Sequence, residues 1–229
     1  MPASWIRRST SAPVYVAPPD RQSLQALSGA LPPLGEDRPT PGLAEYLEFY
    51  AIDFARQQPG VSHRIGTVPS GHNLLLVHGY LDHVGLYRHL IGHALARGCN
   101  VVAFDLPGHG LSTGTPVAIG DFREYGDAIA DVLTALELPR LPWQAMAQST
   151  GAAALVEFAR HHPPWPFTGT VLLAPLLRPA GWWQVRAAHA LVHRFADTVP
   201  RGFADNSSDR DFLAFVRNDP LQSQRIHVS

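Results

Sequence analysis

Short apolar runs alternate with longer amphipathic patterns through the middle of the chain. Residues 73–77 are apolar after the first position, which is typical of a strand covered on both faces. Similar runs predict further strands, at 61–68, 100–104, 143–148 and 170–174. Apolar residues at helical spacing predict helices before and between them, at 43–56, 84–97, 119–138 and 151–161. This alternation predicts an α/β fold with a doubly wound, mostly parallel sheet, whose ligands bind beyond the carboxyl ends of the strands.

The pattern changes on both sides of this core. Residues 1–41 are rich in proline, which removes amide donors and fixes φ, so they are predicted to form an extended arm. The α/β core is then assigned to 42–177. Residues 178–229 show helical patterns at 182–195 and 209–217 but no further parallel strand, which predicts a helical cap or lid segment.

Composition excludes several classes of function. The 229 residues include 45% hydrophobic and 16% charged side chains, so the chain is globular rather than disordered. Eighteen basic and nineteen acidic residues give a net charge of −1 with no basic run, which excludes a nucleic-acid partner. Because Cys99 is the only cysteine, neither an intramolecular disulfide nor a cysteine-based zinc site can form, and no cofactor is implied.

The amino-terminal sequence and the apolar runs predict a location. Residues 1–8 carry charge but are followed by Ser, Thr and Pro instead of the apolar core of a signal peptide. The longest apolar runs, such as Leu74 to Val77, are far shorter than the roughly 20 residues of a membrane helix. The sequence therefore predicts a soluble, cytoplasmic protein without a transmembrane segment.

The strongest chemical signal is the segment from Ala147 to Gly151, Ala-Gln-Ser-Thr-Gly, which nearly matches the pattern G-x-S-x-G. It falls between a predicted strand and a predicted helix, where a nucleophilic serine occupies a strained turn and small neighbours let the backbones approach. Ser149 is thus a candidate nucleophile, and the Thr150 amide is a candidate oxyanion donor at the helix N-terminus. The alternative is that Ser149 only caps the helix, because serine is a preferred N-cap residue.

Two further loops follow predicted strands. His78, Gly79 and Tyr80 follow the strand at 73–77, where an acyl-transfer enzyme needs a second oxyanion amide, here that of Tyr80. The alternative for this loop is an ordinary strand exit with a buried histidine. After the next strand, Asp105 opens a loop rich in Gly and Pro, and it is expected to accept loop amides rather than to take part in catalysis.

The segments LLLVHGYLDH, FDLPGHGLS and AQSTG, in this order, resemble those of the α/β-hydrolase family, and within it the lysophospholipase and monoacylglycerol-lipase-like serine hydrolases. The resemblance covers about residues 61–175. It implies a serine esterase or lipase that hydrolyses carboxylic esters through an acyl-enzyme on Ser149, without a metal, and a small ester or lipid-like substrate. It also makes residues 178–229 the cap, where Asp219 to Leu221 is similar to a DPL triplet of such caps.

The sequence shows no catalytic partners for Ser149. In this fold the acid and the histidine follow the serine, but the two last strands that carry them are not visible, and residues 226–228 complete neither a helix nor a strand in this interpretation. His189 and His193 share a helix face and are candidates for a substitute base, with a metal pair as a less favoured alternative.

Two interpretations follow. In the first, which we favour, the chain is a serine hydrolase truncated before its last two strands, with one sheet edge unpaired. In the second, it is a non-catalytic hydrolase-like module that binds an apolar ligand or a protein partner. Large apolar residues after 178 predict either an acyl site or packing within the cap; they are Trp182, Trp183, Leu191, Phe195, Phe203, Phe212 and Phe215.

Overall fold

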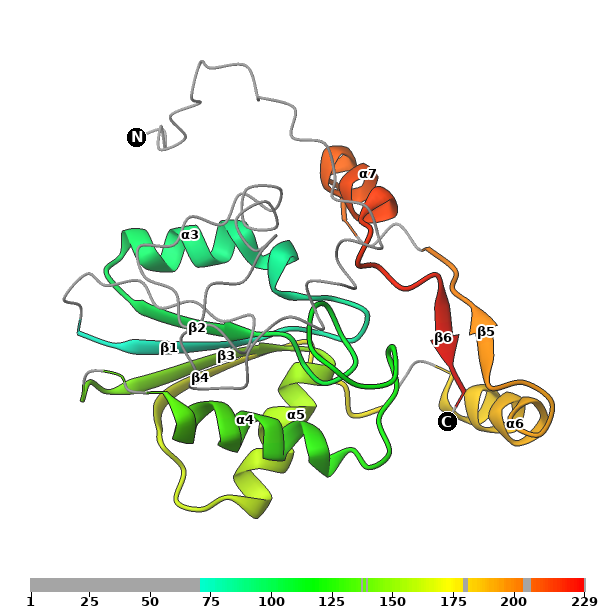
Figure 1. The fold of residues 1–229 in the computed structure, drawn as a ribbon, viewed down its shortest axis with the longest axis horizontal. Helices are drawn as coiled ribbons and strands as arrows, with labels where there is room; N and C mark the ends of the chain where they lie inside the picture. Colours follow the sequence, from blue (N-terminus) through cyan, green and yellow to red (C-terminus); the bar gives the residue numbers. More distant parts are fainter. Residues whose placement is uncertain (1–70, 137, 139, 179–180, 204–206, 229) are drawn as a thin grey trace.

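The computed structural model describes residues 71–136, 138, 140–178, 181–203 and 207–228. The predicted arm at 1–41, the helix at 43–56 and the strand at 61–68 lie outside the described residues. The described chain forms one parallel sheet flanked by helices, followed by a segment with two helices and a short strand pair (Figure 1).

The main sheet is parallel throughout. Its strands are β1 (Asn73–Val77), β2 (Asn100–Phe104), β3 (Trp143–Gln148) and β4 (Phe167–Leu173), in the spatial order β2-β1-β3-β4. The chain passes from β1 to β2 on one side and then returns to β3 on the other side, so the connections diverge between β1 and β3. Ligands of such sheets bind beyond the strand ends at this point. The predicted doubly wound parallel sheet is confirmed.

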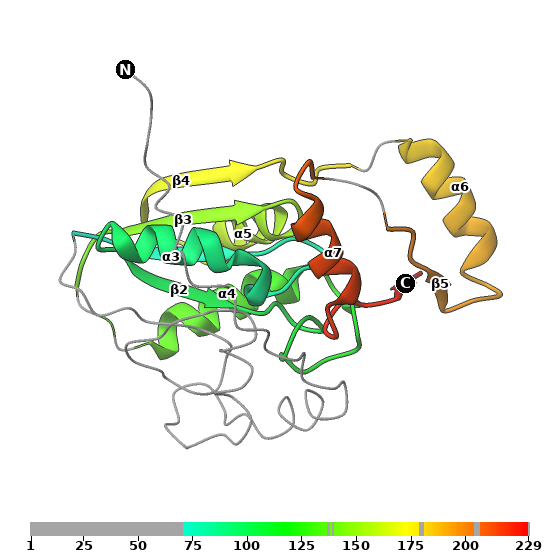
Figure 2. The same ribbon diagram turned by 90° about the horizontal axis from the view of Figure 1, so that it is seen from above.

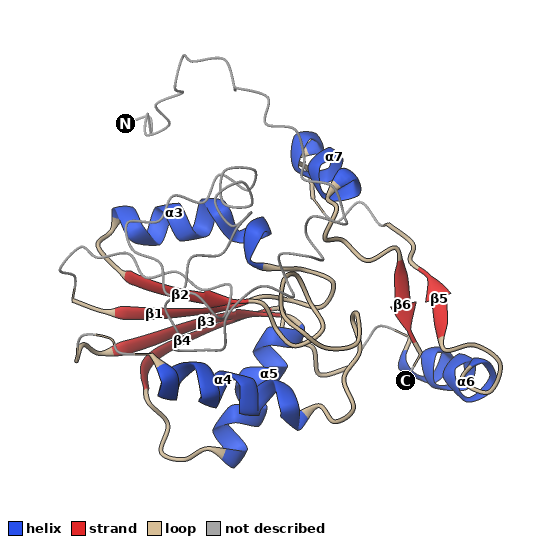
Figure 3. Ribbon diagram, in the orientation of Figure 1, coloured by secondary structure: helices blue, strands red, loops and turns tan. Residues whose placement is uncertain are grey.

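Helices cover both faces of the sheet (Figures 1 and 3). The 3-10 turn η1 (Val84–Tyr87) and helix α3 (Arg88–Ala96) lie on one face, and α4 (Arg123–Ala135) and α5 (Thr150–His161) lie on the other. Leu74 and Leu76 pack on the α3 side, whereas Leu75 and Val77 pack on the side of α4 and α5. All of β1 is buried, as the apolar run predicted. Each buried Leu or Val contributes about 1.5–3 kcal/mol.

Helix α4 begins at Arg123, not at Ile119 as its apolar pattern predicted. The Asp121 amide donates to Glu124 Oε1, and the Arg123 amide donates to Asp121 Oδ1, each over 2.9 Å. This exchange resembles a capping box, which satisfies amides that the first helical turn leaves free. The polar cap therefore sets the start of the helix.

After β4 the chain forms α6 (Trp182–Val192), β5 (Thr198–Pro200), α7 (Arg210–Asn218) and β6 (Arg225–His227). The two helices predicted in this segment are confirmed. Strands β5 and β6 pair antiparallel, with Val199 opposite Ile226, so the prediction that the last residues complete no strand is wrong. Strands of three residues carry no usable periodicity, and this pairing joins segments 27 residues apart.

The two helices of this segment are placed differently. Phe215 of α7 packs against the core on the α3 side, and the Arg88 guanidinium lies 4.8 Å from its ring centroid. In contrast, α6 projects beyond the sheet and has no buried residue, and Trp183 is 72% exposed (Figure 2). Strand β4 pairs only with β3 among the described strands, and its Val171 is 45% exposed. Thus α7 is anchored on the core, whereas α6 and one sheet edge are not covered by described residues.

Gly151 provides a test of how α5 packs on β1. A Cβ atom at Gly151 would lie 2.3 Å from the His78 carbonyl oxygen and 2.7 Å from that of Val77. Gly151→Ala is therefore expected to lower the free energy of unfolding by about 3 kcal/mol, because backbone must move. Gly92→Ala in α3 is the matched control, since nothing lies within 4 Å of its added Cβ and it should gain up to about 1 kcal/mol in helix propensity. Urea unfolding measures both, and equal stability of the two variants would contradict the close approach.

Candidate active site

Ser149 lies on the turn between β3 and α5 with φ 50° and ψ −114°. A positive φ is strained for a residue with a Cβ atom and costs about 1–3 kcal/mol. Ser149 is the N-cap residue of α5, but its side chain makes no capping hydrogen bond to the helix. Ser149 therefore occupies a strained turn between a strand and a helix.

Backbone hydrogen bonds hold this turn from both sides. The Ser149 amide donates to the Leu173 carbonyl at the end of β4 over 2.9 Å. The Ser149 carbonyl accepts from the Leu176 amide over 3.1 Å and from the Ala153 amide over 3.2 Å. The strain at Ser149 thus persists because β4, the loop after it and α5 fix the peptide groups on both sides of this residue.

Glycine lets the loop after β1 approach Ser149. The position that a Cβ atom would take on Gly79 is 3.3 Å from Ser149 Cβ and 3.2 Å from Asp82 Oδ2. Gly151 lies closer still, since its added Cβ would be 2.3 Å from the His78 carbonyl oxygen and 2.7 Å from that of Val77. The structure therefore brings together Gly79, Ser149 and Gly151, and with them the neighbouring residues Tyr80 and Thr150.

His78 is a buried, neutral histidine that connects the segments following β1 and β2. Its Nδ1–H donates to the Gly79 carbonyl and its Nε2 accepts from the Leu106 amide, each over 2.8 Å. Burial, followed by the neighbouring His109, holds the pKa of His78 well below its usual value. Both ring nitrogens are occupied, as expected for the buried histidine of an ordinary strand exit.

Asp105 organises the neighbouring loop. Its Oδ1 accepts from the Val84 amide over 2.7 Å, and its Oδ2 accepts from the Leu111 amide over 2.8 Å. The side chain is 1% exposed, and the chain around Gly110 wraps closely over the carboxylate. The prediction that Asp105 accepts loop amides is confirmed.

A cavity of about 640 Å³ lies beside Ser149. Its polar lining includes Asp82, Tyr87, Gln148 and Arg201. Its apolar lining is contributed by η1, α3, α7 and the segment before α7: Leu86, Leu90, Phe203, Phe212, Leu213 and Val216. The cavity is therefore lined by a mixture of polar and apolar side chains, and α7 contributes the polar Arg217 as well as its apolar residues.

Three polar residues of this cavity, Asp82, Tyr87 and Arg201, were not singled out from the sequence. Burial raises the pKa of Asp82, partly offset by His83 and Arg201, and burial together with Asp82 raises the pKa of Tyr87. The Arg201 guanidinium stacks 4.4 Å from the Phe203 ring centroid. Asp82 and Tyr87 follow Gly79 closely in sequence, and this proximity could have indicated that they belong to the site. Arg201 is distant in sequence and reaches the site only through the tertiary fold.

A second cavity of about 710 Å³ lies between the loop 108–117 and the β5–β6 pair. Ser149 is not part of its lining, although Leu81 and Asp82 line both cavities. The Tyr80 hydroxyl donates to the Val117 carbonyl over 2.8 Å, so the Tyr80 side chain is directed to this loop. The larger cavity is therefore adjacent to the site without containing the candidate nucleophile.

A buried histidine–carboxylate pair ties α7 to the loop after β1. His83 Nε2 donates to Asp219 Oδ2 over 2.9 Å, and His83 Nδ1 accepts from the Gly85 amide over 3.2 Å. Burial lowers the pKa of His83, but the hydrogen bond and charge of Asp219 outweigh it and raise the pKa. Because both ring nitrogens of His83 are engaged, this pair anchors the segment after β4 and does not serve Ser149.

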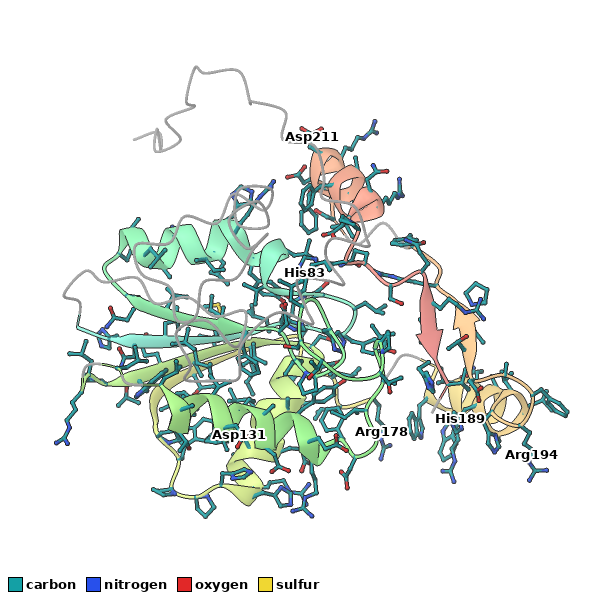
Figure 4. All side chains as sticks on the ribbon, in the orientation of Figure 1. His83, Asp131, Arg178, His189, Arg194 and Asp211 are labelled. Atoms are coloured by element: carbon teal, nitrogen blue, oxygen red, sulfur yellow. The ribbon has the colours of Figure 1, made fainter. Side chains whose placement is uncertain are left out.

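The candidate substitute bases lie elsewhere. His189 and His193 are exposed on α6, with stacked rings 5.2 Å apart, and neither lines the cavity at Ser149. Figure 4 shows His189 on α6, well separated from His83 at the end of the sheet. The described ranges hold no group of three His, Cys, Asp or Glu residues that could bind a metal ion. Among the described residues that line the cavity at Ser149, His89 is the one histidine. It lies at the start of α3 and is exposed.

The strain at Ser149 predicts an unusual effect of glycine. Relative to Ser149→Ala, Ser149→Gly is expected to raise the free energy of unfolding by about 1 kcal/mol, because glycine adopts positive φ without steric cost. Ala153→Gly, inside α5, is the matched control and should lower it by about 1 kcal/mol. Urea unfolding measures all three variants. A loss of stability in Ser149→Gly as large as in the control would contradict the strain.

His78 predicts a loss of stability in acid. Its pKa is lowered in the folded chain, so only the unfolded chain binds a proton as the pH falls below about 6.5. The free energy of unfolding should then fall by up to about 1.4 kcal/mol per pH unit. His83 has a raised pKa in the folded chain, so it adds to the free energy of unfolding as it becomes protonated. This added stability is complete below about pH 6.5 and does not change further in acid. Unfolding between about pH 7.5 and 5.5 should show a shallower slope in His78→Asn than in the unchanged chain, and identical slopes would exclude this role.

Comparison with known proteins gives the family. The sequence profile described as serine aminopeptidase, S33, matches residues 69–229. Monoacylglycerol lipase of Mycolicibacterium smegmatis is 30% identical over 155 residues, which are 65% of this chain and 55% of that protein. Phospholipase YtpA of Bacillus subtilis is 29% identical over 104 residues, 45% of this chain and 40% of that protein. The chain therefore spans about half the length of the curated relatives it matches.

Solved structures share the fold. Monoacylglycerol lipase of Paleococcus ferrophilus aligns with a TM-score of 0.59 at 25% identity, over 73% of this chain and 66% of that chain. A soluble variant of monoglyceride lipase from Saccharomyces cerevisiae, in complex with a substrate analogue, aligns with a TM-score of 0.60 at 17% identity, over 77% and 67%. None of the described helices is long and apolar enough to cross a membrane. Because the profile matches most of its length, the chain belongs to the serine aminopeptidase S33 family of α/β hydrolases.

Proposed function

We propose that Ser149 is the nucleophile of a serine hydrolase of lipid-like carboxylic esters. The observation that carries this proposal is the strained backbone of Ser149 at the β3–α5 turn, beside a cavity lined by both polar and apolar side chains. Strain at a position fixed by several neighbours is common where a nucleophile must be exposed.

In the proposed reaction, Ser149 Oγ attacks the ester carbonyl carbon while the hydroxyl proton passes to a base. The carbonyl oxygen becomes negative in the tetrahedral intermediate, and the amides of Tyr80 and Thr150 donate to it. The partial positive charge at the N-terminus of α5 stabilises the same oxygen. Loss of the alcohol leaves an acyl-enzyme on Ser149, and water releases the acid. His78, Gly79 and Gly151 support the geometry of these amides.

The proposal assigns the nucleophile and the oxyanion hole to described residues, but not the base. The described lining at Ser149 includes no histidine bonded to a carboxylate. This observation favours the second candidate function, a hydrolase-like module that binds an apolar ligand or a partner without turnover. The two functions differ in whether Ser149 reacts with an ester-like electrophile.

The apolar side chains of the cavity are the part of the site that would contact the acyl chain of a substrate. Residues 178–229 would act as the cap, with Phe203 and the apolar residues of α7 as the wall toward this chain. The names of the relatives, monoacylglycerol lipase and phospholipase, support a lipid-like ester. The exposed α6, with Trp182 and Trp183, is not part of this wall. A cytoplasmic location is part of the proposal, since Cys99 is the single cysteine.

The test is covalent labelling of the purified chain with a fluorophosphonate, together with hydrolysis of a short and a long p-nitrophenyl ester. Labelling and turnover should both disappear in Ser149→Ala, because this variant lacks the hydroxyl of the proposed nucleophile. Ser112→Ala removes a hydroxyl that bonds the Asp105 carbonyl and should leave both unchanged. Labelling that survives Ser149→Ala would reject the nucleophile. A folded chain with no labelling at all would support the binding module.

A further inference from the structure

We propose that Tyr87 is a positioning residue of the oxyanion hole, and that its hydroxyl bridges the loop after β1 and the turn after β3. The Gly79 amide donates to Tyr87 Oη over 3.3 Å, and Tyr87 Oη donates to Gln148 Oε1 over 2.7 Å. Gly79 directly precedes Tyr80, and Gln148 directly precedes Ser149. One oxygen atom thus connects the residue before the proposed oxyanion donor Tyr80 with the residue before the proposed nucleophile Ser149; this inference rests on the proposed function.

The bridge lies where the sheet no longer sets the distance between these segments. The β1–β3 ladder ends at Val77 and Ala147. Gly79 and Gln148 lie just beyond these ends, and the spacing of the two amides must be held within a few tenths of an ångström to be useful in catalysis. A side-chain bridge here fixes the separation that the ladder leaves free.

Tyr87 is itself held rigidly. It ends η1, whose first residue, Val84, donates its amide to the buried Asp105 carboxylate. The Tyr87 ring packs against the core on the α3 side. The hydroxyl is therefore carried by a fixed element and can transmit that position to Gly79 and Gln148.

The chemistry of the hydroxyl suits a bridge. Burial and the nearby Asp82 raise the pKa of Tyr87, so the phenol keeps its proton at neutral pH. A phenol has one proton and accepts through its oxygen. With Gln148 Oε1 at 2.7 Å and Asp82 Oδ2 at 3.5 Å, the proton is directed to Gln148, and the oxygen accepts from Gly79.

Tyr87→Phe tests the bridge, because it keeps the ring and removes only the oxygen. The maximal rate constant for fluorophosphonate labelling of Ser149 should fall about tenfold or more, while the reagent concentration for half-maximal rate changes little. Gln148→Leu removes the acceptor at the other end of the bridge and should lower the maximal labelling rate constant by a similar factor. It tests the proposal in place of Tyr87→Phe if that variant does not fold. Tyr125→Phe is the matched control: Tyr125 lies on α4, is 2% exposed and packs in the core on the other face of the sheet, so this variant should label at the unchanged rate.

Hydrogen exchange of the Gly79 amide gives a readout that does not require reactivity. It should become faster in Tyr87→Phe and stay unchanged in Tyr125→Phe. If the unchanged chain labels at Ser149 and Tyr87→Phe labels equally fast, the positioning role is overturned. If no variant labels at Ser149, the proposed function is rejected, but the exchange measurement still tests the bridge. In that case an unchanged exchange rate of the Gly79 amide in Tyr87→Phe overturns the positioning role of Tyr87. Faster Gly79 exchange supports the bridge in either case.

Discussion

The close approach of α5 to the end of β1 is the constraint on which the candidate site depends. Gly151 lies against the carbonyls of Val77 and His78, at a distance that leaves no room for a side chain. This contact holds the turn at Ser149 against the loop after β1, beyond the last pair of the strand ladder. The positive φ of Ser149 is stable there because its amide and its carbonyl are both bonded to other elements.

Buried polar side chains, rather than further secondary structure, fix the loops around this contact. His78 joins the ends of β1 and β2, Asp105 binds amides of two loops, and His83 binds Asp219 in the segment after β4. A buried polar group is costly unless it is paired, so each of these groups strongly favours a single loop arrangement. The Tyr87 bridge belongs to the same class of interaction and lies closest to the proposed chemistry.

Several features of the site could be predicted from the sequence. The apolar run of β1, the turn at Ser149 and the role of Asp105 each depend on neighbouring residues, whose pattern reports the local environment. Other features could not be predicted. The start of α4 depends on the Asp121–Glu124 cap, and the pairing of β5 with β6 joins segments too short to show a period. His189 and His193 share a helix face as expected, but no residue of α6 lines the cavity at Ser149.

The sequence by itself determined the class of fold, the order of its motifs and the place of the candidate nucleophile, because strand periodicity and glycine positions are local properties. Only the tertiary structure decided which side chains surround Ser149. Arg201 and α7 reach the cavity because His83 and Asp219 hold distant segments together, and Tyr87 reaches Gln148 across 61 residues of chain. Contacts of this kind follow from the packing of the sheet and its helices, which no single stretch of sequence encodes.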